Sequence, residues 1–137
     1  MAQVGNVCAR ALRLIGVQDP NEAITADDFA AALEALNAML LRWEASGISM
    51  GWSASSNPSD ELNVPDEALE AVVFQLALRL AVEYQAPITS ALAQGAAAFL
   101  DELRRDVRVA NPIKYRTTAA PLGYSGPRWN IYNDSPV

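Results

Sequence analysis

The chain has 137 residues, 51% of them hydrophobic, with ten basic and sixteen acidic side chains and a net charge of −6. This size and hydrophobic content suit one domain with a packed core and exclude a largely disordered polymer. The acidic balance argues against binding nucleic acid by general charge attraction, because such affinity comes from cations that neutralise phosphates. No apolar run reaches the roughly 18 residues of a membrane span, and the start lacks the pattern of a secretory signal. We therefore expect a soluble, intracellular protein with no membrane partner.

The charge is distributed unevenly along the chain. Residues 1–103 hold four basic and fourteen acidic side chains, a net charge of −10, whereas residues 104–137 hold six basic and two acidic side chains, a net charge of +4. The sequence therefore indicates an acidic body with a basic C-terminal end.

Two amphipathic helices are predicted first. The apolar positions of the first recur at helical intervals and include Cys8, which as a lone cysteine we expect to be a buried thiol, and Gly16 ends it. The second begins at a variant capping box, Thr25 with Asp28 three residues later, and ends at Gly47. Their apolar stripes comprise Val4, Val7, Cys8, Ala11, Leu14 and Ile15, and then Phe29, Ala32, Leu33, Leu36, Met39, Leu40 and Trp43.

Residues 48–64 then break the helical period with a cluster of serines, which predicts an exposed loop or a short hairpin. Seventeen residues are long for a connection within a compact domain. Trp43 lies on the stripe of the preceding helix and is expected in the core. Trp52 lies in the loop among small polar residues, so contact with a neighbouring chain and packing on the core are both open.

Two more helices follow. The third is predicted from Pro65 to about Tyr84 and is apolar on nearly all sides, which is typical of a central helix. Its one thin polar line comprises Gln75, Arg79 and Glu83. The fourth is capped by Thr89 or Ser90 and stopped by Asn111 and Pro112, and Arg105 is placed to pair with Asp101 or Glu102 on its outer face.

These elements predict an all-α fold, a small antiparallel bundle of about four main helices with a long loop and an extended C-terminal tail. The predicted organisation is a helical body at residues 1–110, called the body below, and a docking segment at residues 111–137, called the arm.

Catalytic chemistry has little support. The chain has no histidine and one cysteine, and its glycines do not match a phosphate-binding loop, so we predict no catalytic, cofactor or metal residues and no enzyme. A pair of carboxylates could hydrolyse a cell-wall glycan. Glu44 is the candidate acid for that alternative, although a solvated side chain on a polar helix face explains it better.

The arm is rich in proline and aromatic residues. Ordering it costs more conformational entropy than its four aromatic side chains return on burial, and a body that already uses its apolar faces offers few further contacts. A partner surface can supply them, and interfaces are enriched in Tyr, Trp and Arg. A floppy terminus is the alternative. The predicted docking residues, with Trp52 of the loop, are Tyr115, Arg116, Tyr124, Arg128, Trp129, Ile131 and Tyr132.

The order of several stretches resembles the tail accessory factor, or head-to-tail adaptor, of tailed bacteriophages. The stretches are "ARALRLIGV", "ITADDFAAALEALNAMLLRWEASGI" and "LALRLAVEYQAP", followed by an alanine-rich helix and a tail rich in proline and aromatics. The resemblance covers nearly the whole chain. The sequence departs from the family in a tail that is short beside the longer members, and at residues 85–87, which read Gln, Ala and Pro where a glycine-containing turn is expected.

The resemblance implies a structural protein of the virion neck, assembled in the host cytoplasm. Its copies would form a ring of twelve under the portal protein, retain packaged DNA and carry the tail or nozzle protein. The arm, and with it the loop at residues 48–64, would contact the portal and neighbouring copies. DNA would pass through the channel without sequence-specific binding, and the acidic body suits a channel wall that does not hold phosphates. The alternative is another phage neck protein, either a connector of long-tailed phages or a head-completion stopper.

Overall fold

The computed structural model describes residues 2–110 and, in the arm, the short strands at residues 129–130 and 135–136. The helices are α1 (Val4–Leu14), α2 (Ala26–Ala45), α3 (Leu69–Glu83) and α4 (Ser90–Ala110), and a 3-10 turn, η1 (Asp66–Ala68), leads into α3. The strands β1 (Trp129–Asn130) and β2 (Ser135–Pro136) pair antiparallel, with Trp129 opposite Pro136. The all-α bundle predicted from the sequence is confirmed.

The helix ends follow the local signals in the sequence. Thr25 caps α2, since its Oγ1 accepts a hydrogen bond from the Asp28 amide at 3.2 Å and donates one to the Asp28 carboxylate at 2.7 Å. Gly47, with φ of +92°, lets the chain leave α2, and the Ile48 amide bonds back to the Trp43 carbonyl at 2.9 Å. Of the two candidate caps of α4, Thr89 supplies the side-chain bond, accepting from the Leu92 amide at 3.2 Å.

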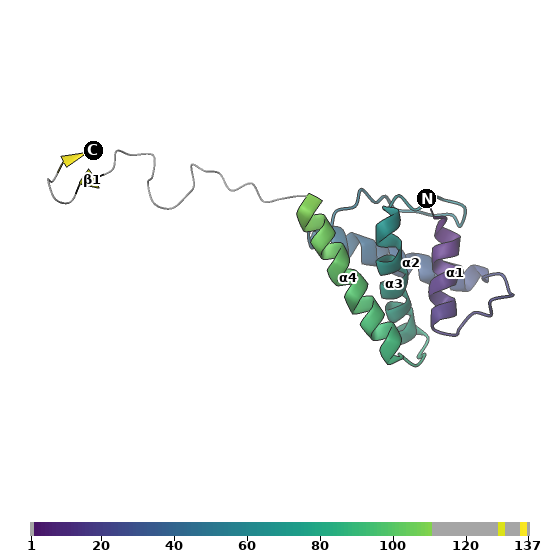
Figure 1. Ribbon diagram of the computed structural model, residues 1–137. Helices are drawn as coiled ribbons and strands as arrows, with labels where there is room; N and C mark the ends of the chain where they lie inside the picture. The colour runs from purple at the N-terminus through teal and green to yellow at the C-terminus, as the bar shows by residue number, and fades with distance from the viewer. Residues whose placement is uncertain (1, 111–128, 131–134, 137) are drawn as a thin grey trace.

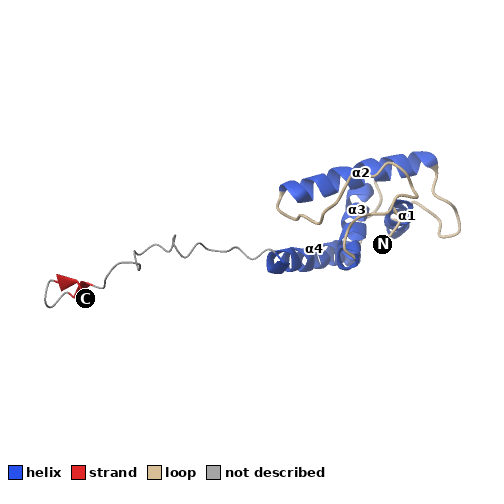
Figure 2. Cartoon of the chain, turned by 90° about the horizontal axis from the view of Figure 1, so that it is seen from above, coloured by secondary structure: helices blue, strands red, loops and turns tan. Residues whose placement is uncertain are grey.

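Three of the helices form one layer. In Figure 1, α3 lies between α4 and α1, and α2 runs across behind them. Figure 2 shows α2 lying across one side of the layer. α3 packs against α1, α2 and α4, which confirms that it is the central helix. α3 and α4 form an antiparallel pair, whereas α1 runs alongside α3 in the same direction (Figure 1).

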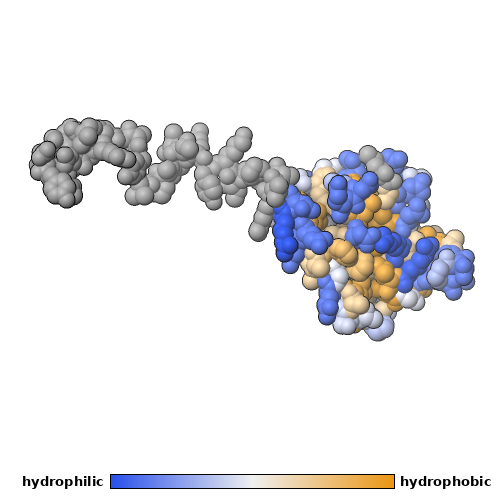
Figure 3. Space-filling view, viewed as in Figure 1, coloured by the Kyte–Doolittle hydropathy of each residue, from blue (hydrophilic) through white to orange (hydrophobic). Residues whose placement is uncertain are grey.

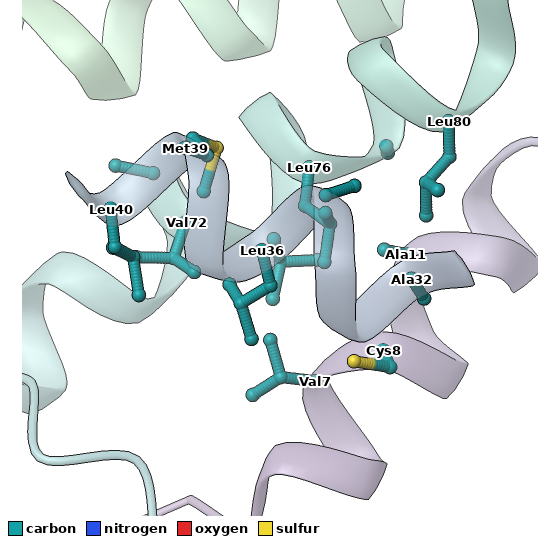
Figure 4. Packing of buried hydrophobic residues seen from close by; sticks show 14 of the residues in the cluster. Val7, Cys8, Ala11, Ala32, Leu36, Met39, Leu40, Val72, Leu76 and Leu80 are labelled. Carbon is teal, nitrogen blue, oxygen red and sulfur yellow. The ribbon is translucent and has the colours of Figure 1, made fainter. Parts of the chain in front are cut away.

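The core lies where α2 crosses α1 and α3. Leu36 and Met39 of α2 meet Val72 and Leu76 of α3 there, and α1 closes the core from the side (Figure 4). No charged or polar residue is buried in the described part of the chain. Cys8 is fully buried, and burial raises the pKa of its thiol to about 12, as expected for a cysteine that serves as a small core residue. Trp43 is also in the core, 6% exposed.

Residues 48–64 form the predicted loop, and most of them are exposed. It forms no hairpin; instead it lies over the start of α1, where the Val4 amide donates to the Asp60 carbonyl at 2.9 Å and the Leu62 amide to the Ala2 carbonyl at 2.8 Å. Its apolar residues Ile48, Leu62 and Val64 are buried in the core. The loop therefore satisfies the free amides at the N-terminus of α1, a contact between segments distant in sequence that periodicity does not report.

Two surface details also differ. On α4, the ion pair found joins Asp101 to Arg104 at 3.6 Å, rather than to the predicted Arg105. Arg10 of α1 pairs with Glu70 of α3 at 2.7 Å, which the sequence did not indicate. Both pairs are largely exposed, so each contributes about 1 kcal/mol or less. No helix in the described part of the chain is both long and apolar enough to span a membrane.

Candidate docking site

Most of the predicted docking residues lie outside the described residues. These are Tyr115, Arg116, Tyr124, Arg128, Ile131 and Tyr132. Trp129 belongs to β1, and its backbone pairs with β2. Figures 1 and 2 draw the β1–β2 pair apart from the helices, and neither strand packs extensively on a helix. Which surface the arm contacts stays a prediction.

Trp52 is half-buried. Its side chain packs against the core of the body from the loop, and this packing accounts for its partial burial. Its indole Nε1–H is buried without a hydrogen-bond partner in the described residues. A buried, unbonded donor is unfavourable. Contact of Trp52 with a neighbouring chain stays a prediction.

An apolar cleft lies at the end of the body from which the arm continues. We call it the arm-root cleft. Its volume is about 480 Å³, within the range of protein ligand pockets, and it opens where η1 and the loop meet the last turns of α4. It is lined by Ser49, Met50, Pro65, Glu67, Ala68, Leu103, Asp106 and Val107.

The arm-root cleft combines an apolar floor with an acidic rim. Ala68 and Leu103 are buried, Met50 and Val107 are half-buried, and all four also belong to or pack against the hydrophobic core. Glu67 and Asp106 are exposed and take part in neither of the ion pairs found in the described residues. A smaller hollow of about 160 Å³, lined in part by Arg104, adjoins the cleft at Val107, so the carboxylates dominate only the cleft itself. This surface can take an apolar side chain accompanied by a positive charge.

A second concave surface lies between α2 and α3. This groove, of about 680 Å³, is lined by Ala31, Glu34, Ala35, Ala38, Arg79, Val82 and Glu83. Val82 is 70% exposed, so this largely apolar helix is not covered on every side. Of the predicted polar line on α3, Arg79 and Glu83 line this groove, whereas the Gln75 amide donates to the Ala96 carbonyl of α4 at 2.9 Å. The groove mixes both charges over small side chains and indicates no particular ligand.

The surface is not uniformly polar. Figure 3 shows hydrophobic residues over the middle of the face formed by α4, α3 and α1, and hydrophilic residues around the end of α4. Leu41 of α2 is 61% exposed and Ile88, before α4, is 48% exposed. Sequence reasoning assigned no docking role to any part of the body except the loop, because a cleft made by separate elements has no signature within a single stretch of sequence.

The shifted pKa values of Tyr84 and Asp28 have structural explanations. The Tyr84 hydroxyl at the end of α3 donates to the Asp28 carboxylate at the start of α2, at 2.7 Å. Burial, and then this bond, raise the pKa of Tyr84 to about 12. The hydrogen bonds from Thr25 and Tyr84 lower the pKa of Asp28. These residues tie the cap of α2 to α3.

The hydrolase alternative depends on Glu44 as its acid. Glu44 is exposed and lines none of the clefts described above. Within residues 2–107, whose side chains are described, no group of three or more His, Cys, Asp or Glu side chains could hold a metal ion.

Comparison with known proteins gives one family. The family model described as P22 tail accessory factor matches residues 1–136, which is nearly the whole chain and includes both the body and the arm. No curated protein matches the chain.

Proposed function

The chain belongs to the P22 tail accessory factor family, a phage tail-related structural family, and on that basis we propose that it is the head-to-tail adaptor of a tailed bacteriophage. In this role its copies form a ring of twelve under the portal protein in the virion neck, assembled in the host cytoplasm. The ring helps to retain packaged DNA and presents the platform for the tail or nozzle protein.

The observation that carries the proposal is the extent of the match. It runs through the helical body and continues through the arm to residue 136, so the family includes the segment that composition singles out as a docking element. A helical body that carries a basic, aromatic arm is well suited to joining other proteins. The predicted arm at residues 111–137, with Tyr115, Arg116, Tyr124, Arg128, Trp129, Ile131 and Tyr132, is the proposed contact to the portal and to neighbouring copies.

Ring geometry would strengthen weak individual contacts. Each arm engages its partner with modest affinity, but twelve arms on one ring bind together, and the effective concentration of each is raised by its neighbours. A chain that is monomeric in solution can thus form a stable ring once it meets a symmetric portal.

The acidic body suits the wall of a DNA channel. The net charge of −10 over residues 1–103 would repel phosphates and let DNA move without adhering, whereas a basic wall would retain it. A structure of the assembled ring tests this point directly. An inner wall dominated by Arg and Lys would contradict it.

The test of the proposed function is to mix the purified chain with the portal protein of the same phage and image the product by electron microscopy. We expect a ring of this protein attached to the portal, and no ring with a portal from an unrelated phage. Binding to tail proteins without binding to the portal would instead place the protein elsewhere in the neck, as a stopper or connector.

A further inference from the structure

We propose that the arm-root cleft of each copy receives the end of the arm of a neighbouring copy, with Trp129 on the apolar floor and Arg128 at the acidic rim. This inference rests on the proposed function, since it names the contact that would link the copies of the ring. The body thus carries the receptor for its own arm, located between η1 and α4.

The apolar floor fits an aromatic anchor. The cleft is about 480 Å³, and its floor is formed by Met50, Ala68, Leu103 and Val107. Buried aromatic side chains remove roughly 150–250 Å² each from water, and hot spots of interfaces are enriched in Trp, Tyr and Arg seated in such pockets. Trp129 is the tryptophan of the arm, and Ile131 and Tyr132 follow it within three residues.

The charges of the two surfaces are complementary. Glu67 and Asp106 lie at the rim of the cleft. The arm carries Lys114, Arg116 and Arg128 against one acidic residue, Asp134, and Arg128 is adjacent to Trp129. An arginine beside an apolar anchor can pair with a rim carboxylate while the anchor is buried, and such charges favour the correct docking partner. The groove between α2 and α3 lacks this match, because Arg79 lines it together with its two carboxylates, Glu34 and Glu83.

The proposed ring, rather than the location of the cleft, selects a neighbouring copy as the source of the arm. The arm continues from Ala110, three residues after Val107 of the cleft, so each copy presents the origin of one arm and the receptor for another at the same end of the body. The eighteen residues from 111 to 128 can extend to about 60 Å, enough to reach an adjacent body. A contact between two different surfaces of identical copies is heterologous, the type that closes into rings.

Cysteine cross-linking between differently labelled chains tests the inference. One full-length preparation carries Asp106→Cys and a second carries Arg128→Cys; they are mixed, assembled on the portal and oxidised. We expect a covalent dimer of the two chains. Native Cys8 is buried and does not compete. The matched control replaces Asp106→Cys with Glu34→Cys, which puts an exposed cysteine in the groove between α2 and α3, and should give at least tenfold less dimer.

The outcomes separate the inference from the proposed function. A chain carrying both Asp106→Cys and Arg128→Cys that closes an internal disulfide as a dilute monomer would show that the arm folds onto its own body and would overturn the inference. Normal rings on the portal without the cross-link would also overturn it, while leaving the proposed function intact. Failure of the unmodified chain to bind the portal would count against the proposed function itself.

Charge reversal provides a second test that does not depend on cysteine chemistry. Glu67→Lys with Asp106→Lys should weaken ring formation on the portal about tenfold or more, because the rim would then repel Arg128. Adding Arg128→Glu should restore at least part of the loss. Glu34→Lys with Glu83→Lys changes the net charge equally, in the groove between α2 and α3, and should leave assembly within about twofold. Equal loss in both pairs, with no recovery by Arg128→Glu, would contradict the inference.

Discussion

The body and the arm differ in the spacing of their apolar residues and in the contacts that their described elements make. In the body, apolar residues at helical spacing find one another across α1, α2 and α3, and the core they form contains no charged group in the described residues. In the arm, aromatic and basic residues stand at irregular spacing between prolines, and β1 and β2 pair with each other rather than packing extensively on a helix. The body therefore shows what a core requires besides hydrophobic content. The spacing must also suit a surface that the same chain supplies.

The largest effect is expected from deleting residues 112–137. The truncated body should keep its helices and remain a soluble monomer, because the described core lies within residues 4–103, but it should lose binding to the portal and to other copies. Circular dichroism measures the first property, and size-exclusion chromatography with electron microscopy measures the second. Ring formation by the truncated chain would remove the distinction between body and arm.

Adjacent leucines of α2 test where stability resides. Leu40 is 2% exposed and Leu41 is 61% exposed. Leu40→Ala should lower the free energy of unfolding by about 2–5 kcal/mol, because it leaves a cavity in the core, whereas Leu41→Ala should change it by about 0.5 kcal/mol or less. Urea denaturation followed by circular dichroism gives both values. At temperatures where the Leu40→Ala variant stays folded, we expect its portal binding to be unchanged.

The cap of α2 should contribute less. Thr25→Ala removes the bond to the Asp28 amide and should lower the free energy of unfolding by about 1 kcal/mol. Thr25→Ser keeps the hydroxyl and is the matched control, expected to remain close to the parent. A loss as large with Thr25→Ser would mean that packing of the Thr25 methyl, not capping, stabilises this end of α2.

The same cap predicts a dependence on pH. The pKa of Asp28 is lowered in the folded protein from an ordinary value of 3.8, so its contribution to stability is complete above that value and is lost as the pH falls through the lowered pKa. Asp28→Asn should make stability less dependent on pH in that acidic range. Tyr84 acts at the other extreme, since its pKa is raised from 10.0 to about 12, and its contribution is lost between those values as the pH rises. Thermal unfolding of the parent, Asp28→Asn and Tyr84→Phe across pH measures both effects.

The smallest effect concerns the turn between α3 and α4. Gln85 has a φ of +52°, a left-handed conformation that favours glycine, and the Ala86 amide bonds to the Ala81 carbonyl at 2.9 Å. Gln85→Gly should therefore raise the free energy of unfolding by up to about 1 kcal/mol. Gln94→Gly, at an exposed position within α4, should lower it by a similar amount. Denaturant midpoints for the two variants should shift in opposite directions, and a shift in the same direction would argue against strain at Gln85.

The departure of the sequence from its family at residues 85–87 thus has a structural counterpart. A glycine-containing turn is expected there, and the backbone does adopt the conformation typical of glycine, with a glutamine in place. Local patterns predicted the other helix ends well, including Thr25 and Gly47, because a cap depends on residues within one turn of each other.

The sequence predicted the candidate site less completely. Its composition predicts a docking role for the arm, which stays a prediction, and no residue of the arm-root cleft except those of the loop was associated with docking. Met50, Ala68 and Leu103 come from a loop, a 3-10 turn and a helix, and they meet only when α4 packs beside η1. The exposure of Val82 likewise depends on packing, since periodicity shows a helix apolar on nearly all sides but not which of its sides are covered.

The sequence itself determined the features that depend on periodicity or composition within one stretch of chain. These are the helix positions and caps, the central place of α3, the buried cysteine and the opposite charges of body and arm. Tertiary structure decided that α2 crosses the layer of the other three helices, that the loop covers the start of α1, and that an acidic apolar cleft opens beside the origin of the arm. Those features depend on contacts between residues distant in sequence, and such contacts are fixed only when the packed elements exclude water from a shared surface.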